Sequence, residues 1–418
     1  MGYPTIKVIK MDFKEINIDK DLLNIYDKTV EDRRYFHRNP ESSLKEYNTA
    51  RYIRQRLKEL DIQYIEVGET GTLGIIKGNR EDNGKTIFLR ADIDALEMND
   101  EKQTEYRSQK EGLHHACGHD GHAAALLSAA EILNKRKDSF GGKIKLCFQQ
   151  AEEIGAGARI FVEEGHLDDV DFVFGLHLAS DTELGKIVAT PGYSNASCDI
   201  FEIKINGKST HAGYPHLGND AAIATASVLL ELQKIISRQI DPNEPVVISV
   251  GEIHSGTRYN VVAEKGYLKG TLRTFNEDLR RSILEKIEKT AKITASINDC
   301  NAEFQNYDAA SSLINPEETT YMLQKTALSI TSEKNIIKDR KAGLGAEDFA
   351  DYLKIQKGVF ARVGSRGSAN TAYPHHSVKF DIDERSLLIA AQLHINMALD
   401  FLKNWQFVNL TKHLLEHR

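Results

Sequence analysis

The sequence has few cysteines, no long apolar run and no excess of basic residues, and each of these absences argues against a class of protein. Four cysteines are spread over 418 residues, unlike the dense cysteine pattern of a small disulfide-stabilised secreted domain. No apolar stretch approaches the roughly 20 residues that a transmembrane helix needs, and residues 1–32 lack a signal-peptide pattern. We therefore expect a cytoplasmic protein with reduced thiols that does not bind a membrane.

The charge balance disfavours nucleic acid as a partner. The chain has 54 lysines and arginines against 61 aspartates and glutamates, a formal net charge of −7, and no basic block. Nucleic-acid binding normally requires a basic surface. Hydrophobic residues make up 41% and charged residues 28% of the chain, which is typical of an ordinary globular protein. Because 418 residues exceed what one hydrophobic core usually covers, we expect two domains.

The first part of the chain alternates strand-like and helix-like segments. Short apolar runs predict strands, and the amphipathic or Ala- and Leu-rich stretches between them predict helices. This alternation favours an α/β fold with a mostly parallel sheet that is covered on both faces. The predicted strands are residues 72–77, 86–91, 143–149 and 171–176, and the predicted helices are 22–60 with a break at Asn39-Pro40, 120–135 and 155–164.

A different order of elements begins near residue 195. It predicts the strand-helix-strand-strand-helix-strand arrangement of a ferredoxin-like α+β domain. We therefore predict one domain made of residues 1–194 and 309–418, with residues 195–308 inserted as a second domain. The elements predicted in the insertion are strands 198–206, 245–252, 260–274 and 302–307 and helices 219–238 and 277–297.

Residues that bind metal ions are most concentrated at positions 114–122, which read His-His-Ala-Cys-Gly-His-Asp-Gly-His. Cysteine, histidine and carboxylate side chains supply the S, N and O donors that hold a borderline divalent ion such as zinc. Cys117 and His119 lie two positions apart in a loop that enters a predicted helix, so both side chains can face one ion. Coordination would also explain a thiol among so many polar neighbours, because a bound metal deprotonates it.

Three predicted strands lead into further residues of this kind. Strand 86–91 is followed by Asp92 and Asp94, strand 143–149 by the pair Glu152-Glu153, and strand 171–176 by His177. Open α/β sheets bind ligands beyond the carboxyl ends of their strands. A single aspartate after a strand is usually a turn or cap residue. The coincidence of three such strands with the Cys-Gly-His segment instead indicates a metal site, in which one glutamate binds the metal and its neighbour takes a proton from the attacking water.

Shorter motifs extend this pattern over most of the chain. Together, and in this order, they resemble the metal-dependent amidohydrolase family that includes aminoacylases, hippurate hydrolases and plant hydrolases of auxin–amino-acid conjugates. The matching segments are Arg33-Arg34…His37…Pro40-Glu41, Arg90-Ala91-Asp92-Ile93-Asp94, His115-Ala116-Cys117-Gly118-His119-Asp120, Glu152-Glu153, Gly175-Leu176-His177, His211…Pro215-His216, Asn260-Val261-Val262, Gly270-Thr271-Leu272-Arg273, Gly345-Ala346-Glu347-Asp348 and His376…Phe380.

The resemblance implies a centre of two divalent ions, zinc or manganese, with cobalt as a third possibility. Glu152 would be the general base, and Asp94 and Asp120 would orient ligand histidines. His122 is interpreted as a supporting residue rather than a ligand. The ligands implied by the resemblance are Cys117, His119, Glu153, His177 and His376.

Two residues are candidates for the late histidine of this set, because His375 and His376 are adjacent. Aligning Lys379-Phe380-Asp381 with the family pattern selects His376, although Val378 stands where proline is commoner. Whether His375 replaces or assists His376 stays open at this point.

For the inserted domain, the resemblance implies a lid that also forms a homodimer. His211 would reach the metal centre together with Asn260 and Arg273, often from a partner subunit. His211 could donate a hydrogen bond to the developing oxyanion, and Arg273 could pair with a substrate carboxylate. The simpler alternative for His211 is an exposed loop histidine. We expect a dimer through 195–308 and a hinge near residues 194 and 309.

The reaction implied by this resemblance is hydrolysis of the amide bond of an N-acyl amino acid by a hydroxide that bridges two ions. Glu152 would take the water proton and pass it to the leaving amine. One alternative is a dipeptidase or carboxypeptidase of the same family, which would be distinguished by the need for a free α-amino group. The other is a metal-binding relative without catalysis, which the presence of Glu152 disfavours.

Overall fold

The computed structural model describes residues 15–404, so residues 1–14 and 405–418 of the predicted first domain lie outside the described part. The chain divides into two compact units. The larger unit comprises residues up to 192, 314–341 and those from 351 onward, and the smaller unit comprises 193–313 and 342–350. No helix among residues 15–404 has both the length and the apolar character needed to cross a membrane.

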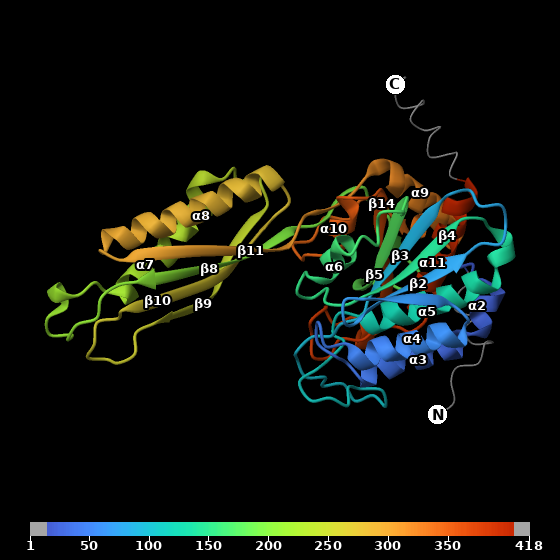
Figure 1. The fold of residues 1–418 in the computed structure, drawn as a ribbon, viewed down its shortest axis with the longest axis horizontal. Helices are drawn as coiled ribbons and strands as arrows, with labels where there is room; N and C mark the ends of the chain where they lie inside the picture. Colours follow the sequence, from blue (N-terminus) through green and yellow to red (C-terminus); the bar gives the residue numbers. More distant parts are fainter. Residues whose placement is uncertain (1–14, 405–418) are drawn as a thin grey trace, which may run out of the picture. The chain divides into compact units, whose positions relative to one another are not determined.

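The larger unit is built on an eight-stranded sheet whose four central strands are parallel (Figure 1). Strand β3 is buried along its whole length, as expected for a parallel strand covered on both faces. This architecture confirms the predicted α/β fold. In sheet order the strands are β1 (Gln63–Val67), β2 (Gly71–Lys77), β4 (Lys143–Gln149), β3 (Thr86–Asp92), β5 (Phe172–Glu183), β14 (Gly358–Arg366), β6 (Ile187–Val188) and β13 (Ile336–Ile337).

Helices cover both faces of this sheet, and the side chains of β3 alternate between them. Ile87 and Leu89 enter a core that also contains buried residues of helices α5 and α11. Phe88 points to the other face, where its ring lies 5.2 Å from that of Tyr352. The helices of this unit are α2 (Lys20–Asn24), α3 (Tyr26–Arg38), α4 (Tyr47–Glu59), α5 (His119–Lys135), α6 (Gly157–Glu163), α9 (Glu317–Leu328), α10 (Phe349–Leu353, at the border between the units) and α11 (Ser386–Asn404).

Two boundaries in the larger unit differ from the prediction. Helix α4 begins at Tyr47 rather than near residue 41, because the Glu41 carboxylate accepts hydrogen bonds from the backbone N–H groups of Asn48 and Thr49, each at 2.9 Å. A carboxylate that satisfies the first N–H groups of a helix lies outside it. Strand β5 does not end at His177 but continues to Glu183, since it stays paired with β14 beyond that residue.

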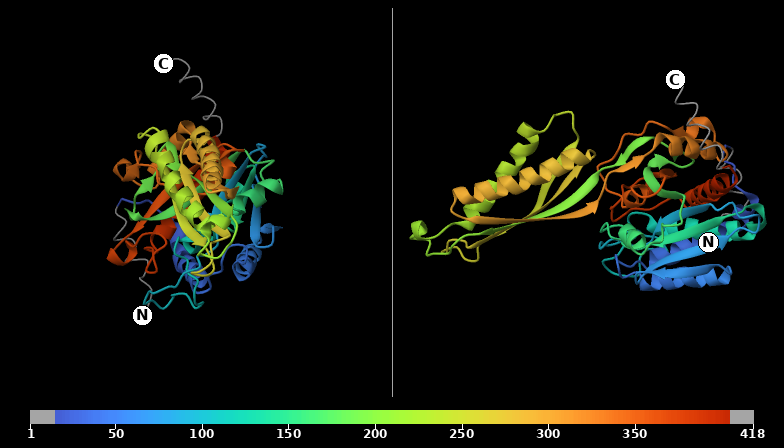
Figure 2. Two further views of the ribbon diagram at one scale, coloured as in Figure 1. Left: turned by 90° about the vertical axis from the view of Figure 1, so that its left-hand side faces the viewer. Right: turned by 45° about the horizontal axis from the view of Figure 1, so that its top comes forward.

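The smaller unit has the predicted ferredoxin-like order of elements around a separate core. Two long helices pack against a four-stranded antiparallel sheet (Figure 2). Strand β10 begins later than predicted, at Lys265, because residues 260–262 bond instead to the loop around His211. In sheet order the strands are β11 (Asn301–Ala310), β8 (Ser197–Asn206), β10 (Lys265–Thr274) and β9 (Val246–Ser255), and the helices are α7 (Ala221–Gln239) and α8 (Glu277–Ile297).

The smaller unit also takes in residues 342–350, which lie outside the predicted range of 195–308. The backbone of Gly343 bonds to the backbone of Ser194 and Ala196, at 3.0 and 3.1 Å. Arg273 donates a hydrogen bond of 2.9 Å to the backbone oxygen of Leu344. The chain first passes into the smaller unit within β7 (Gly192–Asn195) and returns within β12 (Leu313–Asn315), two short strands that pair with each other. It enters the smaller unit again at residue 342 and leaves it after residue 350.

Candidate metal centre

In the larger unit, donor atoms of the predicted kind converge next to the parallel strands. Two groups of three residues each bring their donor atoms within 4.8 Å of one another. The first group is Cys117, His119 and Glu153, and the second is Cys117, His177 and His375. Cys117 belongs to both groups, so its thiolate is placed to contact two ions.

His119, the first residue of α5, is oriented by Asp94. Its Nδ1 lies 3.0 Å from the backbone oxygen of Asp94 and 3.2 Å from a carboxylate oxygen of the same residue. Because the backbone oxygen can only accept, Nδ1 carries the proton and the lone pair is on Nε2. Nε2 is buried without a hydrogen bond, 3.9 Å from an oxygen of Glu153. This is the orientation that a metal-binding histidine needs.

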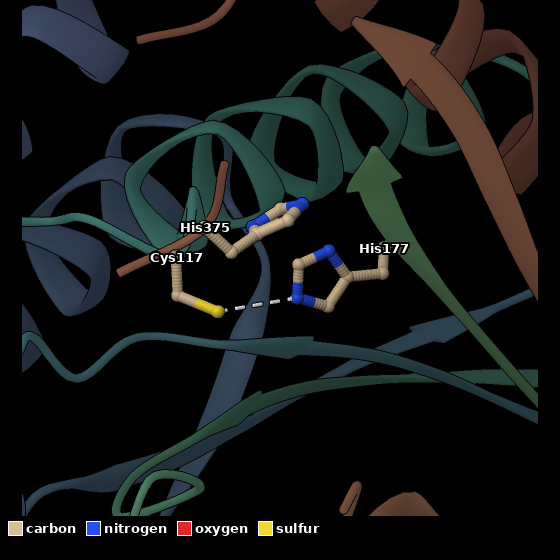
Figure 3. Close-up of side chains that lie close together, drawn as sticks. All are labelled: Cys117, His177 and His375. Carbon is tan, nitrogen blue, oxygen red and sulfur yellow. Dashed lines mark hydrogen bonds between the residues drawn. The ribbon is translucent and has the colours of Figure 1, made fainter. Parts of the chain in front are cut away.

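His177 and His122 have opposite hydrogen-bonding patterns. His177 donates from Nδ1 to the backbone oxygen of Leu178 at 2.7 Å, which leaves Nε2 facing Cys117 Sγ at 3.4 Å (Figure 3). His122 accepts the backbone N–H of Leu178 at Nε2 and contacts Asp92 through Nδ1 at 2.5 Å. Both nitrogens of a neutral His122 are therefore engaged, and only His177 can offer a lone pair to an ion.

The glutamate pair lies in the turn after β4. Ala151, at the start of this turn, has a positive φ of 54°, and the backbone N–H of Glu153 donates to Asp94 at 3.0 Å. The pKa of Glu153 is raised to about 7, mainly by burial; His119 acts to lower it, and Asp94 and Asp92 contribute to the rise. Burial, together with the charge of Glu153, also raises the pKa of the Cys117 thiol. A divalent cation would lower both of these pKa values, since it favours the charged form of each ligand.

Buried polar atoms without partners also fit a bound metal. Oε1 of Glu153 and Nε2 of His119 have no hydrogen bond among the described residues, although buried polar groups are nearly always paired. The other glutamate of the pair, Glu152, has one carboxylate oxygen 3.9 Å from His119 Nε2. The S, N and O donors present are those that zinc and its neighbours accept.

The two late histidines reach different parts of this centre. His376 Nε2 lies 3.7 Å from Glu153 Oε2, and its side chain is 55% exposed. His375 instead belongs to the group with Cys117 and His177. The sequence motif selected His376 and did not show that both rings lie beside predicted ligands.

Asp120 differs from its prediction, because its carboxylate does not contact a predicted ligand histidine. One oxygen accepts hydrogen bonds from Arg33 Nε at 2.8 Å and from His37 Nδ1 at 2.6 Å. His37 in turn lies 2.7 Å from the ammonium of Lys102, which also donates to the backbone oxygen of Phe380 at 2.8 Å. Asp120 therefore connects α5 to α3 in a buried network behind the metal centre.

The remaining predicted residues lie in the smaller unit. His211 accepts a hydrogen bond from the backbone N–H of Gly213 at 3.0 Å, and the next residue, Ala212, donates to the backbone oxygen of Asn260 at 3.1 Å. His211 and Asn260 are thus neighbours. Arg273 is at the other end of β10, beside residues 342–350.

Comparison with known proteins identifies the family. Residues 88–400 match the sequence model of Peptidase family M20/M25/M40. The chain is 35% identical over 398 residues to thermostable carboxypeptidase 2 of Saccharolobus solfataricus, over 94% of this chain and 99% of that protein. It is also 35% identical over 390 residues to N-acetyl-L-cysteine deacetylase of Bacillus subtilis, over 92% and 90% of the two chains.

A solved structure gives the same result. The YXEP protein of Bacillus subtilis, described as a dinuclear metal-binding peptidase from the M20 family, superposes with a TM-score of 0.77 and 32% identity over 92% of this chain and 99% of that one. The family predicted from the motifs is therefore confirmed. The chain belongs to Peptidase family M20/M25/M40, whose members named here hydrolyse amide or peptide bonds.

Proposed function

We propose that this protein is an amidohydrolase that cleaves N-acyl amino acids with two divalent ions, zinc or manganese. The observation that carries the proposal is the thiol of Cys117 shared by two ligand groups, with Glu152 beside them. A relative that deacetylates N-acetyl-L-cysteine and a structural neighbour that binds two metals support it. The proposed ligands are Cys117, His119, Glu153, His177 and His376.

In this proposal the protein supplies the proton transfers. When bound, the ions would polarise the substrate carbonyl and acidify the attacking water. Glu152 accepts a proton from that water and delivers it to the nitrogen of the leaving amine as the C–N bond breaks. Asp94 holds His119 in one orientation, so that its Nε2 faces the centre throughout.

The test is the substitution Glu152→Gln, with Glu285→Gln at an exposed position of helix α8 as the matched control. An amide cannot accept the water proton, so we expect unchanged metal content and a turnover lower by about 10²–10⁴-fold. The control should keep both properties. Near-normal turnover in Glu152→Gln would show that another group is the base.

The substrate class is tested by a panel of N-acetyl amino acids and dipeptides. We expect hydrolysis of substrates whose amine is acylated. A strict requirement for a free α-amino group would favour the dipeptidase or carboxypeptidase alternative, for which the Saccharolobus carboxypeptidase is the precedent. Bound metal without hydrolysis of any substrate would indicate a non-catalytic relative.

We also propose a homodimer through the smaller unit, in which His211 acts on the partner's metal centre. Strand β8 begins at Ser197, which pairs with Thr274 of β10, and strand β11 ends at Ala310, which pairs with Cys198 of β8. Arg273 therefore lies at the end where the chain enters and leaves. The loop of His211 follows the other end of β8, ten residues or roughly 30 Å away. A small substrate cannot span that length, so one subunit would supply Arg273 and its partner His211 with Asn260.

A further inference from the structure

We infer that His375 is itself a metal ligand, to the ion held by Cys117 and His177, in addition to His376. This inference rests on the proposed function, because it requires that the protein binds metal at this centre. The three side chains come from the loop before α5, from strand β5 and from the loop before α11, and they converge in Figure 3.

The geometry of the three donors fits one ion. Cys117 Sγ and His177 Nε2 are 3.4 Å apart, close to the separation of two ligands that share an ion at bond lengths of about 2.3 and 2.0 Å. A ring nitrogen of His375 lies within 4.8 Å of both atoms. The His375 and His177 rings meet edge to face with their centroids 4.9 Å apart, and the centroid of the Phe380 ring also lies 4.9 Å from that of His375. Neighbouring rings thus hold the imidazole in place.

The hydrogen bonding of His375 differs from that of the other histidines at the centre. His119 and His177 each donate from Nδ1 to a backbone oxygen, whereas both nitrogens of His375 are buried without a partner. Among the described residues, His115 and His394 share that property, but neither belongs to a group of potential ligands. Buried polar atoms are nearly always paired, and an ion held by Cys117 and His177 would supply the partner that His375 lacks.

The backbone explains how two adjacent histidines can both serve the centre. His376 has a positive φ of 63°, a conformation that is strained for a residue with a side chain. Its backbone N–H donates to the oxygen of Ala116 at 2.9 Å, beside Cys117. The turn sends His375 toward Cys117 and His177, and His376 toward Glu153. In a regular strand, consecutive side chains would point to opposite faces.

The test compares His375→Ala with His394→Phe. His394 is the matched control, because both of its ring nitrogens are also buried without a hydrogen bond, but it packs on Phe174 and belongs to no group of potential ligands. Metal content is measured after equilibration with limiting zinc and a competing chelator. We expect two ions per chain in the wild type and the control, and one ion bound at least roughly tenfold more weakly in His375→Ala.

A second measurement does not depend on the folding of a variant. In the cobalt-loaded wild type, each ligand histidine should give one strongly shifted, exchangeable imidazole N–H signal in the proton NMR spectrum. Four such signals, from His119, His177, His375 and His376, support the inference. Three signals, or two ions held with wild-type affinity by His375→Ala, overturn it. A wild type that binds no metal would refute the proposed function as well.

Discussion

At the scale of single residues, the hydrogen bonds that each imidazole makes to neighbouring residues decide which histidines can bind metal. His119, His122 and His177 all lie near the centre, and sequence spacing alone allows each to be a ligand. The structure distinguishes His122 from His177. The backbone N–H of Leu178 and the carboxylate of Asp92 occupy both ring nitrogens of His122. His177 uses only Nδ1, on the backbone oxygen of Leu178, so that its Nε2 faces the thiol of Cys117. Such contacts involve residues far apart in sequence, so a motif cannot reveal them.

The shared thiol leads to a residue-scale prediction. Because Cys117 belongs to both ligand groups, Cys117→Ser should weaken the binding of both ions, since a hydroxyl is a harder ligand and deprotonates less readily than a thiol. Cys147→Ser is the control, as that buried thiol lies 3.8 Å from the hydroxyl of Tyr352 and outside both groups. Metal analysis of the two purified variants checks the prediction. Full metal content in Cys117→Ser would rule out the thiolate as a ligand.

At the scale of helices and strands, local signals were reliable where an element is specified by its own residues. Helix α8 has the predicted bounds, because Asn276 caps its first turn and its apolar residues repeat with a helical period. Strand β3 ends at Asp92, and β4 ends at Gln149, three residues before Glu152. Residues 342–350 group with the smaller unit, outside the predicted 195–308, because Gly343 makes backbone hydrogen bonds to Ser194 and Ala196.

A buried ammonium is the clearest contact between elements that the sequence did not predict. Lys102 lies 2.9 Å from His114 Nε2 and 2.7 Å from His37 Nε2, and its side chain is 5% exposed. Because an ammonium only donates, both rings accept from it. His37 therefore carries its proton on Nδ1 and donates to Asp120. The ammonium thus joins the loop around residue 102 to helix α3, to His114 in the loop before α5 and to the backbone of Phe380.

Lys102→Met should lower the free energy of unfolding by about 3–5 kcal/mol, because it leaves buried acceptors and the carboxylate of Asp100 without their cation. Lys289→Met, at an exposed position of α8, should change it by less than about 0.5 kcal/mol. Urea denaturation of both variants gives the comparison. Equal stabilities would mean that the ammonium contributes nothing to the fold.

At the scale of the whole molecule, the proposed division of labour between subunits predicts which inactive variants can rescue each other. His211→Ala mixed with Glu152→Gln should regain about a quarter of wild-type activity, since half of randomly paired dimers are mixed and each has one intact site. Arg273→Ala mixed with Glu152→Gln should stay inactive, because Arg273 is proposed to serve its own subunit. Assays after subunit exchange distinguish the cases. If neither mixture regains activity, His211 does not act across a dimer.

We propose that two ions and the base Glu152 together make this chain a hydrolase of N-acyl amino acids. The most direct test of this claim is to strip the purified protein with a chelator and titrate zinc or manganese back, following bound metal and hydrolysis of N-acetyl amino acids in the same samples. We expect no hydrolysis without metal, and activity that rises until two ions are bound per chain. Full activity in the stripped protein, or two bound ions with no hydrolysis of any N-acyl amino acid, would contradict the claim.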